Sequence, residues 1–74
     1  METMTLGDAV KLATTEFNKA GLGQLQDFEI QTRIIDKQHL VEVTFLKRGN
    51  VRGGGLRVTI DVVKKSVVKK LWLQ

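Results

Sequence analysis

The chain has 74 residues, of which 42% are hydrophobic and 27% are charged, with a formal net charge of +4 at pH 7. This length suits one domain over residues 1–74, and the composition is too apolar for a disordered tail. Because the chain has no Cys and one His, we expect no disulfide, no thiolate chemistry and no metal site. No apolar run approaches the roughly 20 residues that span a bilayer, so we expect no membrane partner.

The first predicted element is a helix over residues 6–20. Thr5 and Asp8 have the spacing of a capping box, and Gly21 is placed to end the helix in the left-handed conformation. Apolar residues recur at spacings of three and four on one predicted stripe: Leu6, Val10, Ala13, Phe17 and Ala20. The stripe predicts that the helix packs against another apolar surface.

Two strands are predicted next, joined by a short polar turn at Asp36, Lys37 and Gln38. From Phe28 to Ile34 apolar and polar residues alternate, and a second alternating segment runs from Leu40 to Leu46, so the two should pair as a hairpin. His39 begins the second strand, and we interpret it as a surface residue because no nucleophile or second His is placed to work with it.

The segment from Arg48 to Gly55 contains four of the chain's seven glycines and two arginines, which predicts a loop between strands. Its amides and the nearby guanidinium groups could bind an anion, but the Gly-Lys-Ser/Thr of a phosphate loop is missing. Together with the preceding turn, this loop is the predicted surface for binding a partner. The candidate residues are Lys37, Gln38, His39, Arg48, Asn50, Arg52 and Arg57.

The C-terminal segment allows two interpretations. Residues 56–62 alternate as a third strand, and the following residues fit either a basic amphipathic helix or a turn at Lys64, Lys65 and Ser66 followed by a fourth strand. β-Branched valines at 62, 63, 67 and 68, together with the lack of a helix cap, favour the strand. In that strand Val68, Lys70 and Trp72 alternate with Val67, Lys69, Leu71 and Leu73. Trp72 is predicted to lie in the core or an interface.

The predicted fold class is therefore α+β: one N-terminal helix packed on a four-stranded antiparallel sheet, in the order α-β-β-β-β, with α-β-β-β-α as the alternative. The run from Ala13 to Lys19 resembles the Ala-x-x-Glu-x-Asn-Lys run of plant cystatins. Residues 53–72 resemble the closing hairpin of PepSY domains and of small bacterial immunity proteins of the nuclear-transport-factor fold. These resemblances imply a cystatin-like superfold and a role in binding another protein.

Cystatins inhibit papain-like proteases with a Gln-x-Val-x-Gly hairpin and a Pro-Trp wedge. The nearest match here, Gln38 to Glu42, lacks the Val and the Gly, and the chain has no Pro. Direct protease inhibition is therefore not what the resemblance implies for this chain. Binding to another protein is compatible with these departures, as it does not depend on that hairpin.

The favoured function is that of a non-enzymatic, inhibitor-like protein-binding domain that uses hairpin loops or a sheet face and needs no cofactor. We expect no enzyme because the acidic residues lack paired spacing and no Ser-His or Cys-His couple is evident. The alternative is a nucleic-acid-binding domain, similar to double-stranded RNA-binding domains, that uses the arginines and Lys64, Lys65, Lys69 and Lys70. A homodimer through the second face of the sheet is also expected, since Ile35, Leu40, Leu46 and Leu73 fall there.

Overall fold

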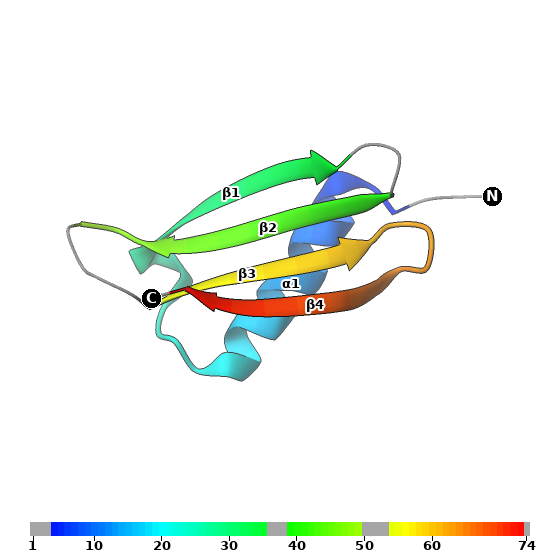
Figure 1. Cartoon of the computed structure of the whole chain (residues 1–74). Coiled ribbons are helices and arrows are strands. Elements are labelled where there is room, and N and C mark those ends of the chain that lie inside the picture. Colours follow the sequence, from blue (N-terminus) through cyan, green and yellow to red (C-terminus); the bar gives the residue numbers. More distant parts are fainter. Residues whose placement is uncertain (1–3, 36–38, 50–53, 74) are drawn as a thin grey trace.

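The computed structural model describes residues 4–35, 39–49 and 54–73. Its elements follow the order α1 (Leu6–Ala20), a 3₁₀ turn (Leu25–Asp27), β1 (Phe28–Ile35), β2 (Leu40–Lys47), β3 (Gly55–Asp61) and β4 (Ser66–Leu73). The four strands form one antiparallel sheet in the spatial order β1-β2-β3-β4. Figure 1 shows this meander with the helix crossing behind it. The α+β prediction is confirmed, and the alternative with a C-terminal helix is wrong.

The helix begins and ends with the residues that the sequence predicts. The Thr5 hydroxyl accepts a hydrogen bond from the amide of Asp8 (3.1 Å), and Gly21 adopts a φ of 68° while its amide bonds the carbonyl of Asn18. Glycine adopts this left-handed conformation at the lowest free-energy cost, because it has no Cβ. These two caps satisfy backbone groups that would otherwise have no partner at the helix ends.

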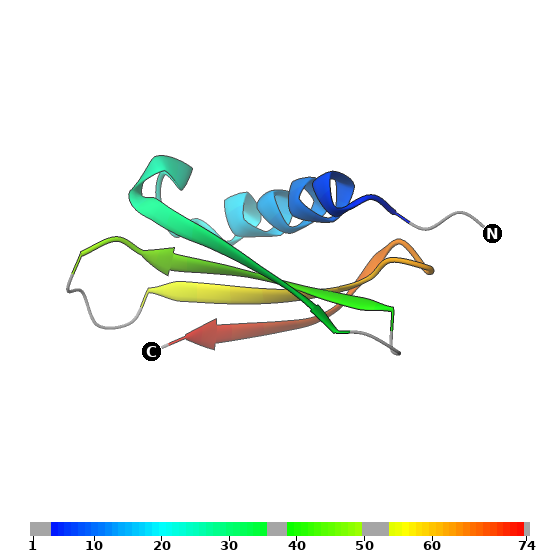
Figure 2. The same ribbon diagram turned by 90° about the horizontal axis from the view of Figure 1, so that it is seen from above.

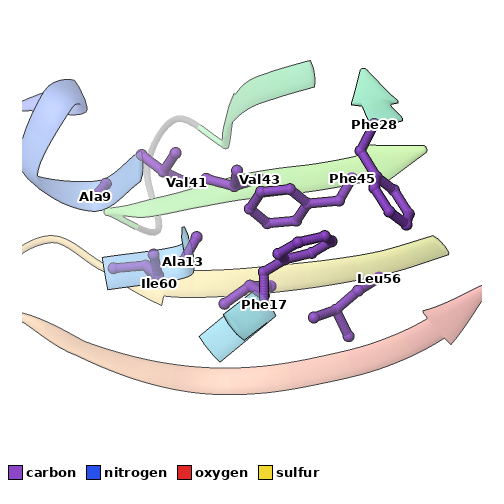
Figure 3. Close-up of a cluster of buried hydrophobic side chains, with 10 residues drawn as sticks. Ala9, Ala13, Phe17, Phe28, Val41, Val43, Phe45, Leu56 and Ile60 are labelled. Atoms are coloured by element: carbon purple, nitrogen blue, oxygen red, sulfur yellow. The ribbon is translucent and has the colours of Figure 1, made fainter. Parts of the chain in front are cut away.

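The core lies between α1 and one face of the sheet. Phe17 stacks on Phe45 and meets Phe28 edge-on, both with ring centroids 4.7 Å apart. Figure 3 shows these rings between the helix and the central strands. The buried core consists of Ala9, Ala13, Phe17, Phe28, Val41, Val43, Phe45, Leu56, Val58 and Ile60. Burying each large side chain of this kind contributes about 1.5–3 kcal/mol to folding, so this layer supplies most of the driving force.

The buried stripe of the helix differs from the prediction. Ala9, Ala13 and Phe17 are fully buried, whereas Leu6 is exposed and Val10 and Ala20 are half-buried. The small alanines allow the helix to lie close to the strands, and Phe17 contacts the rings of Phe28 and Phe45. Ala13 and Phe17 of the predicted stripe are therefore confirmed as core residues, while the prediction left out Ala9 and included Leu6, which is exposed at the start of the helix.

The helix covers only one face of the sheet (Figure 2). Along each strand, residues that alternate with the core residues point to the other face, which carries no further layer among the described residues. We call this the open face. The strand pairing places Ile35 opposite Leu40 at one end, while Leu46 and Leu73 lie on either side of Gly55 at the other end. The prediction that Ile35, Leu40, Leu46 and Leu73 share this face is confirmed by the register.

Gly55 is required by the close packing of the open face. A Cβ at this position would lie 2.9 Å from the carbonyl oxygen of Phe45 and 3.0 Å from Cδ1 of Leu73. Without a side chain, Gly55 lets Leu73 lie flat across β3. The glycine therefore fixes where the end of β4 lies on the sheet.

Candidate functional site

The predicted contact residues do not come together in the structure. His39 directly precedes β2 (Leu40–Lys47) and Arg48 directly follows it, so the two residues lie at opposite ends of this strand. A strand of eight residues is about 25 Å long, so the two hairpin connections cannot form one compact site. Lys37, Gln38, Asn50 and Arg52 lie outside the described residues. The predicted contact residues therefore belong to two separate ends of the sheet, and their role in binding stays a prediction.

Two of the predicted arginines make hydrogen bonds within the fold. The backbone amide of Arg48 donates to the carbonyl of Asp27 (3.0 Å), and its Nε donates to the carbonyl of Phe28 (3.4 Å). Arg57 lies half-buried on the open face, where its Nε donates to the hydroxyl of Thr44 (3.2 Å). These contacts give both guanidinium groups a structural role in joining strands, which reduces their freedom to bind an anion in bidentate fashion.

The end of the sheet that contains His39 is tied together by main-chain hydrogen bonds. The amide of Val62 donates to the carbonyl of His39, and the amide of Met4 donates to the carbonyl of Val62, both at 2.9 Å. His39 and Lys65 both have a φ of 57°, as tight turns often require. His39 is exposed, in agreement with its interpretation as a surface residue.

Asp61 holds the turn between β3 and β4. Its Oδ1 accepts hydrogen bonds from the amides of Val63 and Lys64, both at 2.9 Å. The bond from the Lys64 amide is the largest cause that lowers the pKa of Asp61 below its ordinary value, although desolvation opposes it. The turn spans residues 62–65 rather than Lys64 to Ser66 as predicted, and Ser66 is the first residue of β4.

β4 carries three exposed apolar side chains within five consecutive residues. Val68, Leu71 and Trp72 are 49%, 42% and 55% exposed, although β4 is paired with β3 along its length. The lysines that precede and interrupt them are also exposed. We call this set the β4 surface; it consists of Lys64, Lys65, Val68, Lys69, Lys70, Leu71 and Trp72.

Trp72 is not part of the core. The register places Trp72 opposite Leu56 and Lys70 opposite Val58, so both side chains are on the helix side of the sheet. Nζ of Lys70 lies 3.5 Å from Glu16 of the helix, and Glu16 also pairs with Lys19 (3.6 Å). Trp72 is nevertheless more than half exposed. All three Phe residues are in the core, including Phe28 on the edge strand β1, whereas the single Trp is exposed on the edge strand β4.

A bulge in β4 changes which of its residues share a face. Lys69 pairs with Thr59, but Ile60 pairs with Val67, so Val68 is an extra residue. Val67 therefore lies on the same face as Lys70 and Trp72 and packs against the core. The alternation predicted from sequence, which grouped Val67 with Lys69, is wrong because it assumed an unbroken period of two.

Three of the described carboxylates are engaged in contacts within the fold. Glu16 pairs with two lysines, Glu42 lies 4.0 Å from Arg33, and Asp61 accepts two amide bonds within its turn. Within residues 4–35, 39–49 and 54–73, no group of three or more His, Asp or Glu side chains could hold a metal ion. In the same ranges no helix is long and apolar enough to cross a membrane.

Comparisons of the chain with protein-family models, with curated proteins and with solved structures find no match.

Proposed function

We propose that this protein is a non-catalytic protein-binding domain and that the β4 surface is its contact site. The observation that carries the proposal is the exposure of Trp72 on an edge strand of a domain that buries its other aromatic residues. Trp is enriched among the residues that contribute most to protein–protein binding, because it buries a large apolar area and also has a polar N–H group.

The surroundings of Trp72 support this role. Leu71 is exposed on the open face, Trp72 on the helix side and Val68 at the bulge, so exposed apolar side chains lie on both sides of this edge strand, with lysines toward the turn. An apolar centre with a charged rim is the usual arrangement of a protein–protein contact, in which the rim sets partner choice and the centre supplies affinity. The β4 surface thus combines an apolar anchor with a basic border.

A non-catalytic role is supported by the state of the acidic side chains. Glu16, Glu42 and Asp61 are each engaged in ion pairs or turn hydrogen bonds, and none lies beside a nucleophile or a second free carboxylate in the described contacts. A general acid or base must be free to exchange a proton with a bound substrate, and these three carboxylates are instead held in contacts within the fold. The resemblances to cystatins, PepSY domains and immunity proteins stay a prediction that points to the same general role.

The nucleic-acid alternative receives less support. It depended on a C-terminal helix that would present Lys64, Lys65, Lys69 and Lys70 together, and these residues lie instead on a turn and a strand. Lys69 and Lys70 point to opposite faces of the sheet, and Lys70 is paired with Glu16. Phosphate binding by a common lysine face is therefore harder to achieve here.

The test compares two matched variants of the immobilised full chain, Trp72→Ala and Ile34→Ala. Ile34 is the control because it is 61% exposed, lies on the other edge strand and is also on the helix side. Extract from the cells that express the protein is passed over wild type and both variants, and retained proteins are quantified by mass spectrometry. We expect proteins that wild type and Ile34→Ala retain and Trp72→Ala loses. Equal retention by all three, or equal loss by both variants, would contradict the proposal.

A further inference from the structure

β4 is an edge strand whose second side has no neighbouring strand among the described residues. It pairs with β3 on one side only, so its outward backbone N–H and C=O groups are available to another strand. The bulge at Val68 interrupts the strand, and regular pairing with β3 extends from Lys69 to Leu73. This regular part is long enough to accept a short extended segment, and the bulge limits how far such a segment could pair.

The other edge strand, β1, differs from β4 in how its side chains are distributed. On β1 the apolar side chains of Ile30 and Ile34 lie on the helix side, while Glu29, Gln31 and Arg33 occupy the open face. On β4, Trp72 lies on the helix side and Leu71 and Leu73 lie on the open face. A strand added along Lys69–Leu73 would therefore meet apolar side chains on both of its faces, whereas on β1 the open face is polar until its last residue, Ile35.

The open-face leucines of β4 are held in place by the sheet. Leu73 packs over Gly55, within 3.0 Å of where a Cβ would lie, and Leu71 is opposite Arg57, which is fixed by its bond to Thr44. Side chains that are already ordered lose less conformational entropy when a partner binds. The end of β4 is thus prepared for a partner before binding.

The charge of the surface indicates which partner fits. Lys64, Lys65 and Lys69 have no acidic partner among the ion pairs of the described residues, and the chain has a formal net charge of +4. If two copies paired antiparallel through β4 in a register centred on Lys69 and Lys70, the lysines of both copies would face one another, which like-charge repulsion disfavours. A segment with carboxylates would instead neutralise them.

We infer that β4 binds an extended, acidic segment of a partner protein, which adds to the sheet as a fifth strand along Lys69–Leu73. This inference rests on the proposed function and specifies the partner's chemistry. Side chains of an added strand alternate between faces, so apolar residues should lie beside Leu71, Trp72 and Leu73. Carboxylates should lie beside Lys69 and toward the turn at Lys64 and Lys65.

The test measures binding of a fluorescein-labelled ten-residue peptide to the full chain by fluorescence anisotropy. The peptide alternates valine and threonine in one half and glutamate and threonine in the other, with capped ends. Two further versions are N-methylated at alternate residues, one in each phase. Because successive N–H groups of a strand point to opposite edges, only one phase blocks the bonds to β4. We expect that phase to lose binding and the other phase to keep it.

Protein variants and a neutral peptide complete the test. Trp72→Ala should weaken peptide binding roughly tenfold or more, as expected for a central anchor residue, while Ile34→Ala should leave it unchanged. Replacing the glutamates with glutamines should also weaken binding, and salt should weaken it further for the acidic peptide alone. Equal binding of both N-methylated peptides, equal binding of the neutral peptide, or dimerisation of the chain through β4 would overturn the inference.

The two proposals fail in different ways. Suppose that no strand peptide binds, but that Ile34→Ala retains cellular proteins that Trp72→Ala does not. The fifth-strand inference is then wrong and the proposed function stands. If the Trp72→Ala variant retains the same cellular proteins as wild type, the proposed function is wrong as well. Circular dichroism spectra of both variants show whether either substitution has unfolded the chain.

Discussion

Two neighbouring strands of this sheet, β3 and β4, have opposite environments. β3 is buried along most of its length, with Leu56, Val58 and Ile60 in the core, whereas β4 is exposed from Val68 to Trp72. Yet β4 has more apolar residues than β3. Apolar content therefore does not decide which strand is buried; the position of the helix does.

The difference comes from where α1 lies. Phe17 of the helix reaches Phe45 and Phe28, and the helix covers the central strands, as Figure 3 shows for the core side chains. β4 is joined to the rest of the fold through half-buried Val67, which packs against the core, and through the ion pair of Lys70 with Glu16 of the helix. Val68, Leu71 and Trp72 of β4 lie outside the core and are exposed.

The largest effect on the free energy of unfolding is expected from a substitution in the core. Phe17→Ala removes the ring that joins Phe28 and Phe45, and it should lower the free energy of unfolding by about 3–5 kcal/mol. Urea denaturation followed by circular dichroism measures this loss. For a 74-residue domain the variant should be largely unfolded, and a loss below about 1 kcal/mol would show that the core lies elsewhere.

The next largest effect on stability is expected at Gly55, where β3 and β4 pack closely. Gly55→Ala places a Cβ 2.9 Å from the Phe45 carbonyl oxygen, so the backbone must shift, at a cost of about 1–3 kcal/mol. Gly7→Ala is the matched control, because its Cβ would meet no atom closer than 3.9 Å and alanine is the better helix former. Thermal unfolding should show a lower Tm for the first variant and no loss for the second. Equal changes would contradict the packing of Leu73 over Gly55.

The turn between β3 and β4 should make stability depend on pH. The pKa of Asp61 is lowered in the folded chain, mainly by the hydrogen bond from the Lys64 amide, so its carboxylate stabilises the fold above the unfolded pKa, about 4. That contribution is lost as the pH falls from about 4 through the lower folded pKa. Asp61→Asn should reduce this part of the pH dependence, as measured by denaturation at pH 7 and at pH 3. An unchanged pH profile would contradict the role of Asp61.

The smallest effect on stability is expected at Trp72. Because its side chain is more than half exposed, Trp72→Ala should change the free energy of unfolding by less than about 1 kcal/mol. The same variant should lose the bound partner. Urea denaturation beside the binding assay separates the two effects, and a loss as large as that of Phe17→Ala would make Trp72 a core residue.

Much of the fold could be predicted from local patterns. The caps at Thr5 and Gly21, the alternation in the first three strands and the β-branched valines of β4 are local features, and each predicted its element. The face assignment of Ile35 and Leu40 also followed from alternation.

What could not be predicted depends on contacts between distant residues. The bulge at Val68 arises in the pairing of β4 with β3, and the exposure of Trp72 depends on where the helix lies across the sheet. The sequence could have shown that the β1–β2 and β2–β3 connections lie at opposite ends of the sheet, because successive hairpins of a meander turn at alternate ends. The roles of Arg48 and Arg57 in bonding neighbouring strands had no signal in the sequence.

Trp72 is the single Trp of the chain, so its intrinsic fluorescence tests the central claim directly. We predict emission at long wavelength, typical of a solvent-exposed indole, in the free full chain, and a shift to shorter wavelength when the acidic strand peptide is added. Emission at short wavelength in the free chain would contradict an exposed Trp72. An emission spectrum that does not move while anisotropy reports peptide binding would show that the contact site lies away from β4.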